Sequence, residues 1–163
     1  MKTARSSSNA HRRITHKVPP WLRPKLSTAQ VAGLGMATIQ NLDALRSGTA
    51  SIEILLDWTG GSLTWSRIAE CMAQRNPAAY GEAALAIADQ LKVCTTVINR
   101  FKESQLITVT QAEYLIAREA AKWVDALSEL VDRTTAVEAA NWSDAIIERW
   151  MSAAPSASKT EAA

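Results

Sequence analysis

The sequence has few of the residues on which metal sites and redox centres depend. Its 163 residues include only two histidines, His11 and His16, and two cysteines, Cys71 and Cys94. The cysteines form no C-x-x-C pair and join no histidine cluster, which argues against a zinc site and a thiol redox pair. The histidines lie five residues apart beside an Arg-Arg pair, whose positive charge opposes metal binding. We therefore expect no metal, no cofactor and two buried, reduced thiols.

The motifs of common enzyme classes are also missing. Nucleophilic catalysis needs an activated nucleophile beside a base, and the sequence contains no Walker loop, Rossmann glycine pattern or His-Glu-x-x-His motif. Carboxylate pairs such as Glu53 with Asp57 are spaced four residues apart, which is typical of a solvated helix face. We expect no catalytic residues, and we predict that the protein is not an enzyme.

Long apolar runs are absent, so no segment is expected to span a membrane. The N-terminus has no apolar core of a secretory signal. It also makes a poor transit peptide, because Ile14 is the only larger apolar side chain between Thr3 and Thr15. We therefore expect a cytoplasmic protein.

Acidic residues are missing from the first 42 positions, and the first carboxylate is that of Asp43. From residue 26 onward there are 11 basic and 16 acidic residues, so a body of net charge −5 follows an arm of +7. A cationic arm can release counterions from a phosphate backbone and so bind DNA or RNA. The alternative is a solvated tail, or one that folds back on the acidic body. The seven charges are those of Lys2, Arg5, Arg12, Arg13, Lys17, Arg23 and Lys25, and the predicted nucleic-acid-binding residues are Arg5, Arg12, Arg13, Lys17, Arg23 and Lys25.

The end of the arm combines three prolines with two large apolar side chains, Trp21 and Leu22, within residues 18–24. Prolines favour an extended path that loses little entropy on docking. These two side chains are expected to pack on the body or in a partner's groove. Trp58, just before the glycine pair at 60–61, is a third candidate for docking a partner.

Apolar periodicity predicts an all-α protein. The expected architecture is a bundle of five or six helices around a long antiparallel helical hairpin over residues 79–131, joined by a loop over 105–109. Capping boxes are expected at Thr110 with Glu113 and at Thr135 with Glu138. Whether the helices over 111–131 and 136–151 are continuous stays open.

The predicted organisation is a basic, flexible arm over 1–26, a helical domain over 27–151 and a disordered tail over 152–163. The expected helices cover residues 27–46, 50–58, 62–75, 79–104, 111–131 and 136–151, with Gly60-Gly61 as a break and Ser62 as a cap.

Large side chains at helical spacing indicate the buried faces. In the hairpin, two sets of apolar positions repeat in steps of four and three residues. Along the whole chain, most of the tryptophans fall at or near a helix-face position. The last helix is expected to bury Val137, Ala140, Ile147 and either Trp150 or Met151. The expected hairpin seams are Ile87, Leu91, Cys94, Ile98 and Phe101, facing Ile116, Ala120, Trp123, Leu127 and Leu130; Trp65, Trp123, Trp142 and Trp150 are expected in the core.

The run Asn-Leu-Asp-Ala-Leu-Arg-Ser-Gly-Thr-Ala over residues 41–50 resembles a segment in small helical proteins of proteobacterial phages and mobile elements. The helix start at Thr110-x-x-Glu113 occupies a similar place in them. The resemblance covers about residues 30–130. It implies a bacterial, mobile genomic context, and it carries no functional residues across because that family has no settled activity.

Together these features predict a non-enzymatic accessory or regulatory protein that acts by macromolecular contact. In one form of the hypothesis, the arm binds DNA or RNA while the body forms a homodimer or recruits a protein. In the other, the body is a protein-interaction module, for example an inhibitor of a host or rival complex, and the arm is incidental. A helix-turn-helix over residues 50–75 is disfavoured, because Leu63 and Trp65 near its turn require burial.

Overall fold

The computed structural model describes residues 25–153, apart from some side chains of the first helix. The predicted disordered arm and tail fall almost wholly on residues 1–24 and 154–163, which lie outside the described residues. Within 25–153 the chain is helical, as predicted, and the only strand-like pairing is a single bridge between Lys25 and Asp132. The five helices are α1 (Thr28–Ser47), α2 (Ile52–Arg75), α3 (Pro77–Ser104), α4 (Gln111–Ser128) and α5 (Arg133–Ala153).

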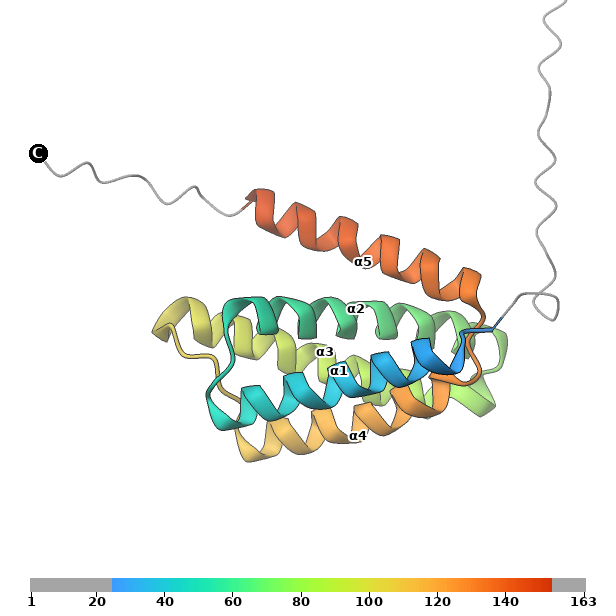
Figure 1. The fold of residues 1–163 in the computed structure, drawn as a ribbon, viewed down its shortest axis with the longest axis horizontal. Helices are drawn as coiled ribbons and strands as arrows, with labels where there is room; N and C mark the ends of the chain where they lie inside the picture. Colours follow the sequence, from blue (N-terminus) through green and yellow to red (C-terminus); the bar gives the residue numbers. More distant parts are fainter. Residues whose placement is uncertain (1–24, 154–163) are drawn as a thin grey trace, which may run out of the picture.

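Helices α1 to α4 form an up-down-up-down bundle, and α5 lies outside it on α2 (Figure 1). Around the bundle, α1 packs on α2 and α4, and α3 packs on the same two helices. The predicted antiparallel hairpin is formed by α3 and α4. The fifth helix runs back along α2 and diverges from it towards its own C-terminal end (Figure 1). No helix among residues 25–153 is long and apolar enough to cross a membrane.

The glycine pair does not break α2, and the predicted break there is wrong. The helix continues through Gly60 and Gly61 for 24 residues, so Ser62 is no cap. A Cβ atom at Gly60 would lie 3.1 Å from Ile147 Cδ1 of α5. The Ser143 hydroxyl of α5 donates a hydrogen bond to the Gly60 carbonyl at 2.9 Å. Gly60 therefore allows α5 to approach the α2 backbone, and packing outweighs the low helix propensity of glycine.

The last two helices are separate, because α4 ends at Ser128 and α5 begins at Arg133. The Asp132 carboxylate caps α5 by accepting hydrogen bonds from the Thr135 backbone N–H at 2.9 Å and from its hydroxyl at 2.7 Å. It also lies 3.7 Å from the Arg75 guanidinium at the end of α2. The cap predicted from Thr135 and Glu138 is thus wrong. The capping box of Thr110 with Glu113 is confirmed.

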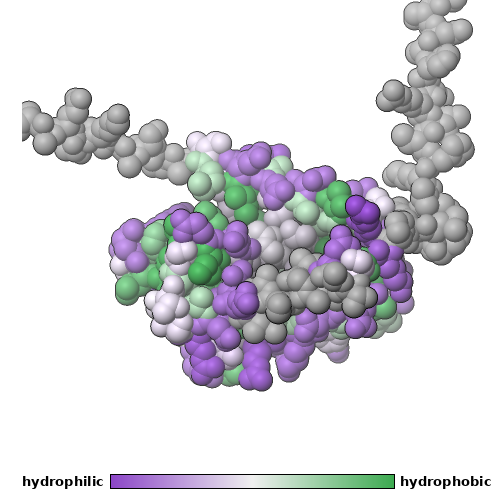
Figure 2. Space-filling view, viewed as in Figure 1, coloured by the Kyte–Doolittle hydropathy of each residue, from purple (hydrophilic) through white to green (hydrophobic). Residues whose placement is uncertain are grey.

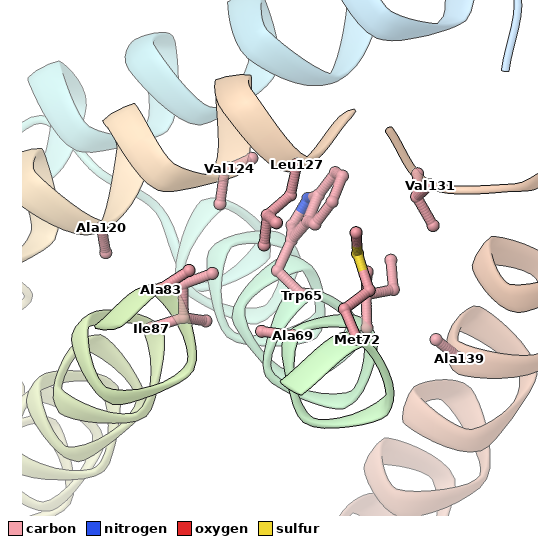
Figure 3. Packing of buried hydrophobic residues seen from close by; sticks show 11 residues of the cluster. Trp65, Ala69, Met72, Ala83, Ile87, Ala120, Val124, Leu127, Val131 and Ala139 are labelled. Atoms are coloured by element: carbon pink, nitrogen blue, oxygen red, sulfur yellow. The ribbon is translucent and has the colours of Figure 1, made fainter. Parts of the chain in front are cut away.

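The apolar core consists of two clusters at opposite ends of the bundle. In one, Trp65 of α2 packs with Val124 and Leu127 of α4, near Ile87 of α3 (Figure 3). The other, around Leu45 and Leu55, joins α1 to α2, α3 and α4. Both cysteines of the described chain are free, so apolar packing and not a disulfide joins these helices.

The predicted seam of α4 is only partly correct. Ala120 and Leu127 are buried, but Ile116 and Leu130 are 40% and 48% exposed. Small side chains such as Ala117 take the buried positions instead, since α4 packs closely against both α1 and α3.

The prediction that four tryptophans lie in the core is also only partly correct. Trp65 is buried, Trp123 is half-buried, and Trp142 and Trp150 of α5 are exposed. Val137 is exposed as well. The predictions for Val137, Trp142 and Trp150 are wrong, whereas Ala140 and Ile147 are half-buried. Helix α5 packs mainly on one neighbour, α2, so only a narrow stripe around Ala139 and Ser143 is fully covered.

Candidate functional site

Most of the residues predicted to bind nucleic acid or a partner lie in the arm. Among them, Lys25 is exposed, and its backbone pairs with that of Asp132 at the start of α5. Trp58 is buried in the core and only 3% exposed, so the prediction that it docks a partner is wrong. The predicted residues outside the described range are Arg5, Arg12, Arg13, Lys17, Trp21, Leu22 and Arg23.

The structure shows a feature that the sequence did not suggest, a cavity of about 340 Å³ among α1 to α4. Its floor lies between the two apolar clusters. Its rim is open to solvent at Gln40 of α1 and at Asp57 and Gly61 of α2, with Thr38 and Asn41 half-buried beside them. The buried floor consists of Trp58, Ser62, Trp65, Gln90 and Val124.

A short hydrogen-bond network fixes the polar part of this floor. The Ser62 hydroxyl donates to the Trp58 carbonyl at 2.7 Å, as a serine can within a helix. Having used its one hydrogen, Ser62 Oγ accepts from Gln90 Nε2 at 2.8 Å and from Cys94 Sγ at 3.3 Å. The serine thereby fixes which end of the Gln90 amide faces it, because only the NH₂ group can donate.

The other end of that amide has no partner. Gln90 is 3% exposed, and its Oε1 accepts no hydrogen bond in the part of the chain that the structure describes. A buried acceptor left unpaired costs about 1–3 kcal/mol. The cavity floor therefore carries a buried acceptor that a donor group would stabilise.

Cys94, below the same floor, is not a reactive thiol. Burial raises the pKa of its thiol to about 12, and the hydrogen bond to Ser62 only partly opposes this shift. The thiolate is the nucleophilic form of cysteine, so Cys94 acts as a weak donor within the network. Cys71 is half-buried, which corrects the expectation that both thiols are buried.

Sequence reasoning missed Gln90, although a signal for it exists. Gln90 stands three residues after Ile87 and four before Cys94, on the apolar stripe of α3. A long polar side chain at such a position must find a partner or a cavity. Ser62 was predicted to cap a helix, and not to line a cavity, because the glycine pair beside it suggested a turn.

A second candidate surface lies on the outer helix. Four large apolar side chains of α5 are exposed, at positions spread around the helix: Val137, Trp142, Trp150 and Met151. The Arg67 guanidinium lies over a Trp142 ring, 5.6 Å from its centre. Trp142 is nevertheless 40% exposed to solvent. Figure 2 shows apolar side chains at the surface along α5, at the top of the view. Tryptophan and methionine are enriched where proteins bind one another.

Among residues 25–153, no group of three or more histidine, cysteine, aspartate and glutamate side chains is placed to hold a metal ion. No family model matches the chain, and no curated protein or solved structure matches it either.

Proposed function

We propose that this protein is a non-enzymatic accessory or regulatory protein, of the phage or mobile-element type that residues 41–50 resemble, and that its basic arm binds nucleic acid. The observation that carries the proposal is the separation of charge, with +7 over residues 1–25 and −5 over residues 26–163. An acidic body repels phosphate, whereas an arm without carboxylates attracts it. The arm is therefore the part of the chain on which contact with DNA or RNA depends.

The place where the arm joins the body supports this division. Lys25 is exposed and pairs through its backbone with Asp132, at the end of the bundle where α2 ends and α5 begins. The Asp132 carboxylate pairs with Arg75 and accepts hydrogen bonds from Thr135. The backbone pairing of Lys25 leaves its side chain exposed at this end of the bundle.

The test compares the full-length protein with an arm-neutralised variant that keeps Lys25 and its backbone pairing. Fluorescence anisotropy with a short labelled DNA duplex and a single-stranded RNA, in about 50 mM salt, measures both affinities. A second variant with lysine at the four arginine positions keeps the charge and should bind nearly as well. Equal affinity of the wild-type and neutralised proteins would contradict the proposal. The neutralised variant carries Lys2→Gln, Arg5→Gln, Arg12→Gln, Arg13→Gln, Lys17→Gln and Arg23→Gln.

The exposed apolar side chains of α5 favour a second candidate function, in which the body binds a protein and the arm is incidental. Trp150→Glu replaces one of these side chains by a charge, and Ser152→Glu places the same charge on another side of α5. Sedimentation measures self-association, and nuclease-treated pull-downs from the native host measure other partners. The expected result is an association that Trp150→Glu abolishes and Ser152→Glu preserves. An association that both variants retain, or none at all, excludes this function.

A further inference from the structure

The described residues that line the cavity among α1 to α4 offer acceptors and aromatic surface, and no basic side chain. Gln90 Oε1 on its floor is an unpaired acceptor. The Asp57 carboxylate on its rim takes part in no ion pair or hydrogen bond with any other described residue. Trp58 and Trp65 contribute two indole groups to its wall. No lysine or arginine is among the described residues that line it.

Each of these groups selects for the same kind of ligand. An unpaired amide oxygen requires an N–H or O–H donor. A carboxylate at the rim attracts positive charge and repels anions. Indole rings attract cations through their π faces, and they pack well against flat groups. A ligand that meets all three requirements is planar, carries N–H donors and is positively charged.

We propose that this cavity binds a small planar organic cation with N–H donors, of the amidinium or protonated aminoheterocycle class. Its N–H group donates to Gln90 Oε1, its charge lies near Asp57, and its flat face packs on the indole wall. A cavity of about 340 Å³ lies within the range of small-molecule sites and accommodates one substituted ring. The proposal does not rest on nucleic-acid binding by the arm, since the Asp57 carboxylate disfavours an anionic ligand in this cavity.

Gly61 offers a way to close the cavity without disturbing the core. A Cβ atom added there would meet no atom within 4 Å, and Gly61 lies on the rim. Gly81 of α3 is a matched control, because a Cβ atom there also meets nothing within 4 Å and Gly81 does not line the cavity. Leucine at either position replaces a helical glycine, so both variants are expected to melt at a higher temperature than the wild type.

The experiment titrates the full-length protein with benzamidinium chloride, a flat amidinium ion, and with sodium benzoate, an anion of the same shape. Calorimetry and saturation-transfer NMR report binding. Benzamidinium is expected to bind once per chain, with a dissociation constant on the order of 1 mM for so small a ligand, and benzoate is expected not to bind. Gly61→Leu should abolish binding, and Gly81→Leu should leave it unchanged.

Two further variants test the individual contacts. Asp57→Asn should weaken binding about fivefold, as for a partly exposed ion pair. Gln90→Leu, which keeps a side chain of similar volume, should weaken it about tenfold through loss of one acceptor. Absence of saturable binding overturns the proposal and leaves water as the occupant of the cavity. Equal binding of benzoate, or binding that persists in Gly61→Leu, overturns it as well.

Discussion

The full-length protein is expected to lose about three and a half orders of magnitude of affinity for duplex DNA when salt rises from about 50 to about 200 mM. Each phosphate that a lysine or arginine neutralises contributes about −0.9 to the slope of log affinity against log salt concentration. The arm holds seven such charges, so a slope near −6 is expected if nearly all of them contact phosphates. Single-stranded RNA should give a smaller slope, because its counterions are less condensed.

The arm-neutralised variant is the control for this slope. It keeps one arm charge, that of Lys25, and the same acidic body. Its affinity should be weak at low salt and change little with added salt. A steep slope that persists in this variant would place the phosphate contacts on the helical body and contradict the account.

Leu45→Ala is expected to lower the free energy of unfolding by about 2–5 kcal/mol, the usual cost of this change in a core. Leu45 is fully buried in the cluster that joins α1 to α2, α3 and α4. Because α1 covers one side of the cavity, its packing also holds the rim residues of α1 in place. Urea unfolding followed by circular dichroism measures the loss.

Leu85→Ala makes the same change on the surface of α3, where Leu85 is 71% exposed. It should alter the free energy of unfolding by no more than about 0.5 kcal/mol. If Leu45→Ala lowered the free energy of unfolding no more than Leu85→Ala does, the packing of α1 described above would be contradicted.

Local signals in the sequence predicted three of the helix boundaries. Gly48 ends α1 with a φ of 71°, a conformation that glycine adopts without strain. Asn76 and Pro77 separate α2 from α3, since proline disfavours a helical conformation at the preceding residue. The box of Thr110 with Glu113 starts α4. These features depend on neighbouring residues alone, so one sequence is enough to find them.

Features that depend on contacts between helices were not predictable in the same way. The glycine pair has the propensity of a break, and only the approach of α5 shows why α2 keeps glycine at position 60. Glu113 both caps α4 and pairs with Arg100 of α3 at 2.6 Å, a bond across the hairpin that no local pattern indicates. Trp142 and Trp150 follow a core-like spacing, yet α5 has too few neighbours to bury them.

The two candidate sites, the arm and the cavity, also differ in whether the sequence alone indicates them. The charge of the arm is plain in the sequence, because it needs no fold to be counted. The cavity is not, because its residues come from four helices and only the packed bundle brings Asp57, Trp65 and Gln90 together. Gln90 is the one member whose polar nature on an apolar stripe was a usable signal.

The central claim is that the arm binds nucleic acid while the helical body does not. The most direct test is to titrate the isotope-labelled full-length protein with a short DNA duplex and follow every backbone amide by NMR. The account predicts shifts and broadening confined to about residues 1–25, with the amides of α1 to α5 unchanged. Perturbations on the faces of α2, α3 or α4, with the arm unaffected, would contradict it.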